Sequence, residues 1–356
     1  MQNFAYAIAP DISSASEAAA QGAQLVAGGT EILNWMRLGI VSADRVIDIT
    51  RLPELSSIDR QGDEIRIGAL ATLNQIEGSD IVRQDAPVLS QACLLAASAQ
   101  LRNRATIGGN VLQKTRCPYF RAEAATDDRM PWPCNKRVPG SGCSARDGYF
   151  NRAALFGATE ACVATQPSDP AVALAALDAE LDLVGPAGSR SIPVTRFHVT
   201  QSEAADLAQT RQGRRLLGGD VPETPDALIE NRLMPGEIIV AYRFYVDTAS
   251  RNSAYVKLRE RESYEYAMAS AAVCLDQSAG QVRQTRIALG SIAQKPWRLS
   301  RAEAALSGQT LDEERLTSVL VTAFSDAEPL PHQDYKVKVA QGAVRRALTK
   351  AGGSIQ

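Results

Sequence analysis

The sequence predicts a globular α+β protein of two or three domains. Short strand patterns alternate with helix patterns in the first part of the chain, a long polar segment without any period interrupts them, and consecutive strands followed by helices occupy the last part. The length of 356 residues exceeds what one hydrophobic core usually organises. The 45% apolar and 22% charged residues are close to average for globular domains.

The first part of the chain alternates strands with short helices. Gln24–Ala27, Arg45–Ile49 and Glu64–Leu70 are short apolar runs bounded by Gly and Asp, which is typical of strands. Ala86–Leu101 carries apolar residues at helical spacing, and Ala105–Ile107 is expected to return to strand.

The segment from Gln113 to about Gly157 has a different character. Pro118, Pro131, Pro133 and several glycines interrupt a polar run that follows no period. A loop of that length is uncommon inside a compact domain. We therefore expect this segment to be disordered or to be held by something other than a hydrophobic core.

Regular patterns resume after this segment. Ser168 is a helix-capping residue before the expected helix Asp169–Leu177, and the strand Glu180–Val184 follows. Dense Gly and Pro around Gly213–Pro225 indicate a boundary before the last unit. The elements expected in that unit are the strands Glu237–Val246, Ser253–Leu258, Ala267–Asp276 and Val282–Leu289, then the helices Arg301–Ser307, Asp312–Ala327 and Gln333–Ala351.

Charge and composition exclude several classes of function. The net charge is −2 and the basic residues are scattered, so the chain lacks the one-sided basic field of a nucleic-acid binder. No apolar stretch is long enough for a membrane span, and the start of the chain lacks the pattern of a secretory signal. Only His198 and His332 occur, which leaves few groups for conventional acid–base catalysis.

Two glycine pairs are the first candidate binding elements. Gly28 and Gly29 follow an apolar strand and precede Thr30, and the sequence around Gly109 and Asn110 repeats this arrangement. Backbone N–H groups at such turns can converge on an anion, so the two loops are interpreted as two arms of one pyrophosphate site. A single loop of this kind is more often a plain tight turn. Ser168 and Asp169 form a third candidate element, for which ordinary helix capping is the alternative.

Four of the six cysteines frame the irregular segment. Cys117, Cys134, Cys143 and Cys162 are widely spaced, and three of them adjoin Pro or Gly. Cysteines in such turns commonly bind iron–sulfur clusters, whereas structural zinc sites usually contain close cysteine pairs. Two disulfides, a zinc site or unrelated thiols remain the alternatives. The other two cysteines, Cys93 and Cys274, lie in apolar patterns and are expected to fill the core.

These motifs carry a family resemblance. AGGTE at residues 27–31, ATIGGN at 105–110 and PSD at 167–169 resemble the flavin subunits of the molybdenum hydroxylases, the xanthine dehydrogenase family. The similarity runs nearly end to end. KTRCPYFR at 114–121 and PCNKR at 133–137 resemble one branch, the flavin subunits of periplasmic aldehyde oxidoreductases.

The resemblance implies a domain organisation. Residues 1–225 would form a two-part FAD-binding domain of the PCMH (vanillyl-alcohol-oxidase-like) type, with a first lobe at 1–56 and a second at 57–225. Residues 113–163 would be an iron–sulfur insertion. Residues 226–356 would form an α+β domain like the C-terminal domain of CO dehydrogenase flavoproteins.

The resemblance also implies site residues. The FAD contacts would be Leu25, Val26, Ala27, Gly28, Gly29, Thr30, Glu31, Ile32, Thr106, Gly109, Asn110, Gln113, Ser168, Asp169, Lys257 and Tyr266. For Lys257 and Tyr266 the alternatives are a solvated strand charge and an exposed turn. The ligands of a 4Fe-4S cluster would be the four framing cysteines, and no residue has a catalytic role. Because no histidine precedes His198, a histidyl-linked flavin at the first glycine loop is excluded, and FAD is expected to be dissociable.

The implied function is electron transfer within a heterotrimer. A large subunit with the molybdenum cofactor would oxidise an aldehyde to a carboxylate, and a small 2Fe-2S subunit would pass electrons to this chain and on to an external acceptor. Export to the periplasm would depend on a partner's signal, with the cytoplasm as the alternative location. A self-contained flavin oxidase, a flavin subunit like that of 4-hydroxybenzoyl-CoA reductase and a zinc-stabilised binding module are the rival interpretations.

Overall fold

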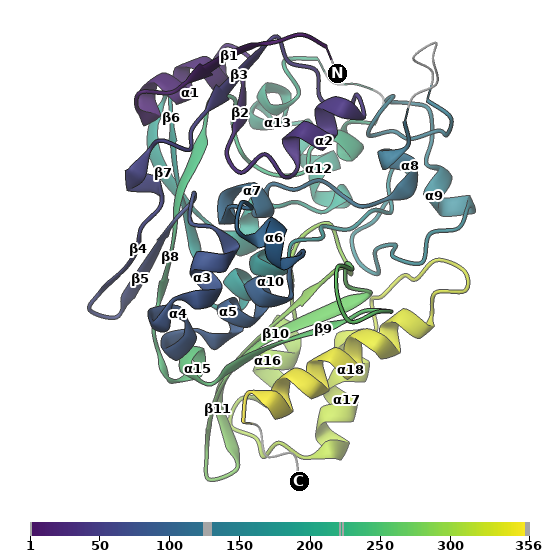
Figure 1. The fold of residues 1–356 in the computed structure, drawn as a ribbon. Coiled ribbons are helices and arrows are strands. Elements are labelled where there is room, and N and C mark those ends of the chain that lie inside the picture. Colours follow the sequence, from purple (N-terminus) through teal and green to yellow (C-terminus); the bar gives the residue numbers. More distant parts are fainter. Residues whose placement is uncertain (1, 124–129, 221, 223, 353–356) are drawn as a thin grey trace.

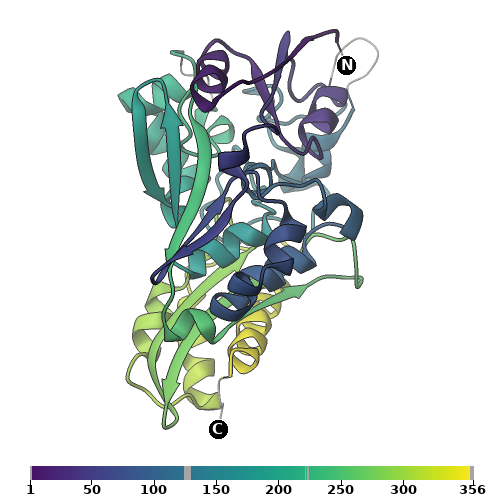
Figure 2. The same cartoon turned by 60° about the vertical axis from the view of Figure 1, so that its left-hand side comes forward.

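The computed structural model describes residues 2–123, 130–220, 222 and 224–352, and contains three β-sheets with helices packed around them (Figure 1). A three-stranded sheet lies near the N-terminus, and a four-stranded sheet lies at the other end of the molecule with the C-terminal helices. Figure 2 shows the five-stranded sheet along one side, between the other two. Within the described residues, no helix has both the length and the apolar character to cross a bilayer.

The N-terminal sheet is parallel, in the order β1-β3-β2. Parallel neighbours need a crossover connection, and helices supply both crossovers here. The elements are β1 (Ala5–Ile8), α1 (Ile12–Ala20), β2 (Gln24–Val26), α2 (Ile32–Arg37) and β3 (Arg45–Asp48). The first glycine pair therefore lies in the tight connection between β2 and α2.

The five-stranded sheet is antiparallel, in the order β4-β5-β8-β6-β7. Its strands are β4 (Ile58–Gln61), β5 (Glu64–Gly68), β6 (Glu180–Gly185), β7 (Gly188–Pro193) and β8 (Ile238–Tyr245). The sequence listed residues 237–246 with the strands of the last unit, whereas β8 pairs with β5 and β6 in the five-stranded sheet. A continuous apolar strand gives no local sign of which sheet it joins. The division of the chain at residue 225 stays a prediction.

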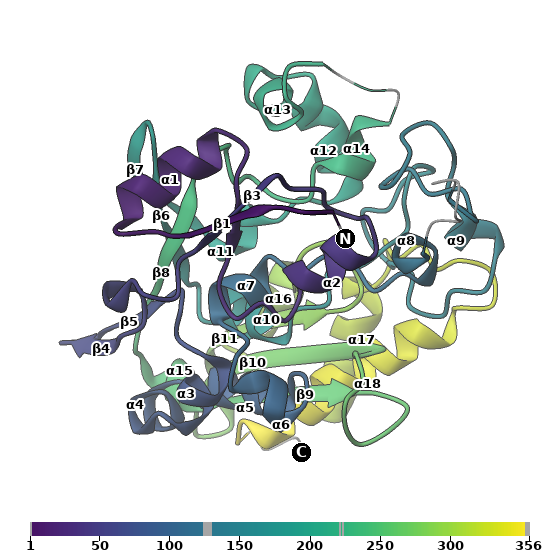
Figure 3. The same cartoon turned by 45° about the horizontal axis from the view of Figure 1, so that its top comes forward.

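Helices and the irregular segment occupy the long connection between β5 and β6. They are α3 (Leu73–Gly78), α4 (Asp80–Asp85), α5 (Pro87–Leu95), α6 (Ala99–Arg102), α7 (Ile107–Val111), α8 (Pro118–Arg121), α9 (Ser144–Asp147) and α10 (Asp169–Ala176). In Figure 3, α8 and α9 lie on the far side of α2 from the five-stranded sheet. In its described residues, 113–123 and 130–157, the segment expected to be irregular contains the two short helices α8 and α9.

Two element predictions in this region were wrong. The single helix expected at 86–101 is broken, because Ala97 adopts a left-handed conformation with φ 49° and Ser98 caps a new helix. The strand expected at 105–107 is the start of α7, since the Thr106 side chain accepts a hydrogen bond from the Gly109 amide as its N-cap. Both regions border the cavity described below.

The remaining helices and strands lie between and after the elements already described. They are η1 (Pro53–Leu55), α11 (Val194–Phe197), α12 (Gln201–Ala208), α13 (Arg211–Leu216), α14 (Pro225–Leu228), α15 (Thr248–Arg251), β9 (Ser253–Leu258), β10 (Ala269–Ser278), β11 (Gln281–Gly290), β12 (Trp297–Arg298), α16 (Ser300–Leu306), α17 (Glu313–Ala323) and α18 (Tyr335–Lys350). β9 to β12 form the antiparallel sheet β12-β11-β10-β9.

The four-stranded sheet is covered by helices on both faces. Successive side chains of a strand point to opposite faces. On β10, Ala272 and Cys274 belong to the core that includes α5 and α10, whereas Ala271, Val273 and Leu275 belong to the core that includes α16, α17 and α18. Both non-framing cysteines, Cys93 and Cys274, are fully buried in the first of these cores, as predicted.

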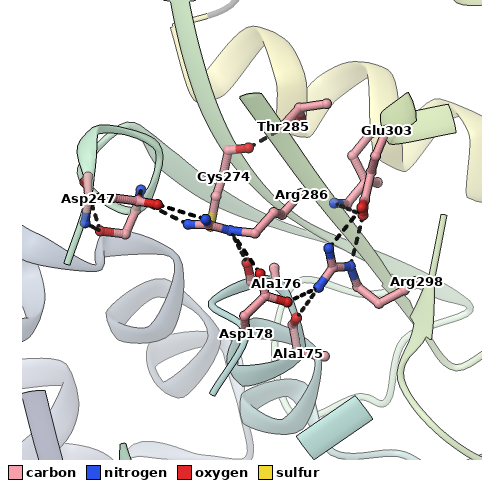
Figure 4. A network of polar contacts seen from close by, with 11 residues as sticks. Ala175, Ala176, Asp178, Asp247, Cys274, Thr285, Arg286, Arg298 and Glu303 are labelled. Carbon is pink, nitrogen blue, oxygen red and sulfur yellow. Dashed lines mark hydrogen bonds and ion pairs between the residues drawn. The ribbon is translucent and has the colours of Figure 1, made fainter. Parts of the chain in front are cut away.

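Two arginines of this sheet hold the C-terminal end of α10 (Figure 4). Arg286 donates to the Ala176 carbonyl at 2.9 Å and forms an ion pair with Asp247 at 2.7 Å. Arg298 donates to the Ala175 carbonyl at 2.9 Å. Cations are favourable at a helix C-terminus, where free carbonyls and the helix dipole concentrate negative charge. The sheet thereby fixes α10, whose other end carries two predicted site residues.

Candidate functional site

A cavity of about 460 Å³ lies where the two glycine loops meet. This volume is within the usual range of small-molecule and cofactor pockets. The predicted FAD contacts that line it are Leu25, Ala27, Gly28, Gly29, Thr30, Glu31, Ile32, Thr106, Gly109, Asn110, Gln113, Asp169 and Tyr266. The structure thus brings together residues that are far apart in the sequence, from β2 through to the loop before β10.

The two glycine loops approach each other more closely than side chains allow. A Cβ on Gly28 would lie 1.7 Å from the Arg104 carbonyl oxygen, far inside any permitted contact. A Cβ on Gly108 would lie 3.0 Å from the Ala69 carbonyl oxygen. Gly29 has φ +74°, a conformation that other residues rarely adopt. Glycine is therefore required sterically at Gly28 and by backbone conformation at Gly29, while a Cβ at Gly108 would be tight. The glycines of both loops line the cavity.

The third predicted element packs against the second loop. Ser168 accepts from the Ala171 amide as the N-cap of α10, and its hydroxyl donates to Asn110 Oδ1 at 2.7 Å. Asp169 lines the cavity and accepts from the Tyr255 hydroxyl at 2.6 Å and from Lys257 Nζ at 2.8 Å. Ser168 is therefore both a helix cap and a support for Asn110.

Three predicted contacts do not line the cavity: Val26, Ser168 and Lys257. The Lys257 side chain is buried, and it donates to the Leu95 carbonyl at 3.1 Å in addition to Asp169. The expected alternative of a solvated strand charge does not describe it. The ion pair with Lys257 orients the Asp169 carboxylate, so Lys257 supports a residue of the cavity wall without lining the cavity itself.

A charged cluster joins the first glycine loop to the irregular segment. Glu31 pairs with Arg116 and, at 3.0 Å, with Arg121, and it accepts from Trp35 Nε1 at 2.8 Å. The Arg116 guanidinium stacks 4.4 Å from the centre of the Tyr266 ring. Burial raises the pKa of Tyr266 to about 12, so this hydroxyl stays protonated at neutral pH.

Sequence reasoning missed part of the cavity wall. Ala96 and Ala97 line it at the break between α5 and α6, and the turn at Pro235 and Gly236 lines it before β8. The Pro-Gly pair was a recognisable turn signal, but nothing local placed that turn beside the glycine loops. Arg116 was also missed, although it directly precedes the first framing cysteine.

The four framing cysteines line a second, small cavity. Cys134 and Cys143 face each other in an isolated antiparallel bridge, and Cys117, Cys134 and Cys162 are buried in a common apolar cluster. All six cysteines of the chain are free thiols, so the predicted disulfide alternative has no support in the structure. Turns and short helices deliver the four sulfurs, as the Pro and Gly neighbours predicted.

Backbone amides surround these sulfurs. Burial raises the pKa of Cys117 to about 11, and the amides of Phe120 and Tyr119 oppose that shift. A hydrogen bond from Cys162 and nearby amides lower the pKa of Cys143 to about 6. Amide donors at thiolate sulfur are a feature of iron–sulfur sites, where they tune the potential.

The four cysteines fit a metal cluster because they line one cavity and because backbone amides face their sulfurs. In the part of the chain that the structure describes, no group of three or more His, Cys, Asp or Glu side chains is placed to hold a metal ion. The donor set is nevertheless four thiols and no histidine or carboxylate, which is the set that iron–sulfur clusters use.

Comparison with known proteins identifies the family. The family described as "FAD binding domain in molybdopterin dehydrogenase" matches residues 2–214, and "CO dehydrogenase flavoprotein C-terminal domain" matches residues 253–351. The chain belongs to this FAD-binding molybdopterin dehydrogenase family. The predicted fold class and the predicted family resemblance are both confirmed, and the chain is a flavin subunit of an oxidoreductase complex of the molybdenum hydroxylase type.

Several relatives of this flavin subunit match along most of their length. The Escherichia coli K12 aldehyde oxidoreductase FAD-binding subunit PaoB is 37% identical over 93% of this chain and 92% of its own length. The carbon monoxide dehydrogenase medium chain of Hydrogenophaga pseudoflava is 27% identical over 92% and 89%. A solved structure of carbon monoxide dehydrogenase from the same organism superposes with a TM-score of 0.71 at 26% identity, covering 99% of this chain and 98% of that one.

Proposed function

We propose that this flavin subunit is the electron-transfer subunit of a molybdenum-dependent aldehyde oxidoreductase and holds FAD and a 4Fe-4S cluster. Its partners would be a large molybdenum-cofactor subunit and a small 2Fe-2S subunit in a heterotrimer, with an external acceptor receiving the electrons. The observation that carries this proposal is the meeting of four free thiols in one cavity of a chain that also has the FAD-binding fold. The 37% identity to an aldehyde oxidoreductase subunit favours an aldehyde as the substrate of the complex.

The large cavity suits a dinucleotide flavin. Gly28 and Gly109 would let backbone N–H groups approach a pyrophosphate, and Thr30 and Asn110 would add polar groups at the loop ends. The Asp169 carboxylate is held by Lys257 and would accept from a ribose hydroxyl. When bound, FAD accepts electrons singly and releases them in pairs, so the protein's tasks are positioning and the control of potential.

The small cavity suits the cluster. Cys117, Cys134, Cys143 and Cys162 would be its four ligands, and the amides that face them would stabilise thiolate charge. Arg116 lines the flavin cavity and is joined by one peptide bond to Cys117. The chain therefore provides a direct covalent and electrostatic connection between the two proposed cofactor sites.

One preparation tests the proposal. The native complex, purified without air, should show flavin absorbance with a broad iron–sulfur shoulder, about four iron atoms per chain beyond those of the 2Fe-2S subunit, and two co-purifying subunits. Flavin without that iron would leave a flavin oxidase or a cluster-free subunit. Zinc without flavin would point to the binding module. A colourless, metal-free native protein would reject the assignment altogether.

We further propose a periplasmic location, reached in complex with a partner that carries the export signal. The support is that the insertion motifs resemble the periplasmic branch. Cell fractionation of a strain that expresses all subunits tests this directly. Retention of the folded complex in the cytoplasm, with the partner's signal intact, would contradict it.

A further inference from the structure

A third cavity lies between the two proposed cofactor sites. It has a volume of about 30 Å³. It shares Gln113 with the wall of the flavin cavity. It shares Thr115 and Lys136 with the wall of the cysteine cavity. This small cavity, named the junction chamber below, therefore borders both sites.

The walls of the junction chamber carry polar atoms that are buried without a partner. They are His198 Nδ1, Gln201 Oε1 and both amide atoms of Gln294. The three side chains belong to residues that are 3%, 1% and 8% exposed. A buried polar atom that makes no hydrogen bond is costly, and such atoms are uncommon in folded proteins. Four of them at one small cavity indicate that the chamber contains a polar ligand.

The hydrogen bonds around the chamber show which of the unpartnered atoms need a hydrogen donor. Gln166 Nε2 donates to the Val111 carbonyl at 3.0 Å and to the Gln113 carbonyl at 3.3 Å, which uses both of its hydrogens. His198 Nε2 lies 2.9 Å from the same Val111 oxygen, so it carries the proton. His198 Nδ1 is then an acceptor, and burial lowers the pKa of His198 to about 4, which keeps the ring neutral.

The unpartnered atoms are therefore three acceptors and one amide NH₂ group. The NH₂ group of Gln294 cannot donate to the oxygen of its own amide. A second donor is therefore required to satisfy all three acceptors. Water supplies two donors and two acceptors, and a buried water needs about 10–15 Å³ of such space. The chamber of about 30 Å³ accordingly has room for about two waters.

A partly buried ion group forms another wall of the chamber. Glu230 pairs with Lys136 at 3.1 Å and also with Lys114. Burial would raise the pKa of Glu230, but the two ammonium groups outweigh it and lower the pKa to about 2. Lys114 lies 5.6 Å from the centre of the Trp35 ring, which lines the flavin cavity, and Lys136 lines the cysteine cavity. Fixed charge thus extends from one site to the other along the chamber.

We infer that the junction chamber is a water-binding site, holding about two ordered waters, that connects the flavin and cluster environments. The water site stands on the unpartnered atoms and the cavity alone. The connecting role rests on the proposed function. Water there would hydrogen-bond to His198, Gln201 and Gln294 and would hold the polar wall that Gln113 and Lys136 share with the two cofactor sites.

The experiment combines a structure with one matched pair of variants. A high-resolution crystal structure of the native complex should show water within hydrogen-bond distance of His198 Nδ1, Gln201 Oε1 and the Gln294 amide. Gln294→Met removes the amide that would bind these waters, so the hydrogen bonds to the two remaining buried acceptors weaken and the Tm should fall by about 2–4 °C. Gln61→Met, the same change at an exposed strand residue, should leave the Tm within about 1 °C.

Each outcome decides a part of the inference. A dry chamber, or a higher Tm for Gln294→Met because an unpartnered amide has been removed, would overturn the water site. If water is present, the variant should also shift the midpoint potentials of both flavin and cluster, and two unchanged potentials would overturn the connecting role. Wild-type protein that contains no flavin or no cluster iron would count against the proposed function. The ordered waters and the direction of the Tm change would still test the water site in that case.

Discussion

Replacement of Gly28 by alanine should weaken FAD binding while leaving the fold intact. The added Cβ would lie 1.7 Å from the Arg104 carbonyl oxygen and 2.6 Å from its carbon. Ordinary van der Waals contact begins at 3.4 Å, so the two glycine loops have to separate by about 1.7 Å. These loops form opposite arms of the cavity, and their separation would move the backbone donors away from a bound pyrophosphate.

The size of the effect follows from the cost of forcing the loops together. Inserting one methyl group into a closely packed site costs about 1–3 kcal/mol. In the FAD-free protein the loops can separate and relieve that strain, whereas bound FAD would need them at their original spacing. The strain then subtracts from binding, and the dissociation constant of FAD should rise by about 5- to 150-fold.

The assay is equilibrium binding of FAD to the flavin-stripped complex, followed by flavin fluorescence. Gly78→Ala is the matched control, because a Cβ at Gly78 meets no atom within 4 Å and its φ is not positive. The control should bind FAD as tightly as the wild type. Unchanged affinity in Gly28→Ala would refute the reasoning, and an equal loss of Tm in the FAD-free and FAD-bound forms would show a general folding defect instead.

Three further predictions concern the insertion and its supports. Cys134→Ser should lose the iron of the proposed cluster and keep FAD, whereas Cys274→Ser, outside the small cavity, should keep both by metal and flavin analysis. Lys136→Met should lower the cluster's midpoint potential by on the order of 50 mV in a redox titration, because a positive charge beside the thiolates is lost. Lys114→Met is the control, since it removes the other partner of Glu230. An equal shift of the potential in Lys114→Met would contradict the specific role of Lys136. Burial and the charge of Arg152 lower the pKa of Lys336 from 10.5 to about 7, so the unfolded chain binds more protons between these pH values and stability rises with pH across that window. Lys336→Met should remove a slope of about 1.4 kcal/mol per pH unit from unfolding measured between pH 7.5 and 9, and parallel curves for the two proteins would exclude it.

The sequence was sufficient where a local pattern determines the structure. The cap at Ser168 starts α10 as predicted, and the apolar run predicted as a strand at 267–276 forms β10, whose residues 269–275 are buried on both faces. The glycine requirement at Gly28 also follows from a local pattern, although its cause is a contact with Arg104, far along the chain. The predicted FAD contacts therefore gather around one cavity with three exceptions, and the four predicted cysteine ligands line another.

The sequence was insufficient where distant segments decide the outcome. β8 looks like any buried strand, and only its pairing with β5 and β6 shows which sheet it joins. Lys257 gives no local sign that it is buried against Asp169, and Arg116 gives none that it reaches Tyr266. Such contacts depend on tertiary packing, which local propensity does not encode.

The supports of the insertion bear on what a cluster would do there. An irregular segment needs contacts that offset its conformational entropy, and part of this one packs in the apolar cluster that contains Phe120, Phe150 and Val163. Arg121 pairs with Glu31 in the first glycine loop, and Arg137 donates to the Leu38 carbonyl at 3.0 Å. The insertion also accepts a hydrogen bond at the Ala153 carbonyl from Lys336 of α18. These contacts attach the insertion to both ends of the protein without any sulfur ligand. A cluster is therefore not required as the sole structural support, and a site that adjoins the flavin cavity through Arg116 favours an electron-transfer role.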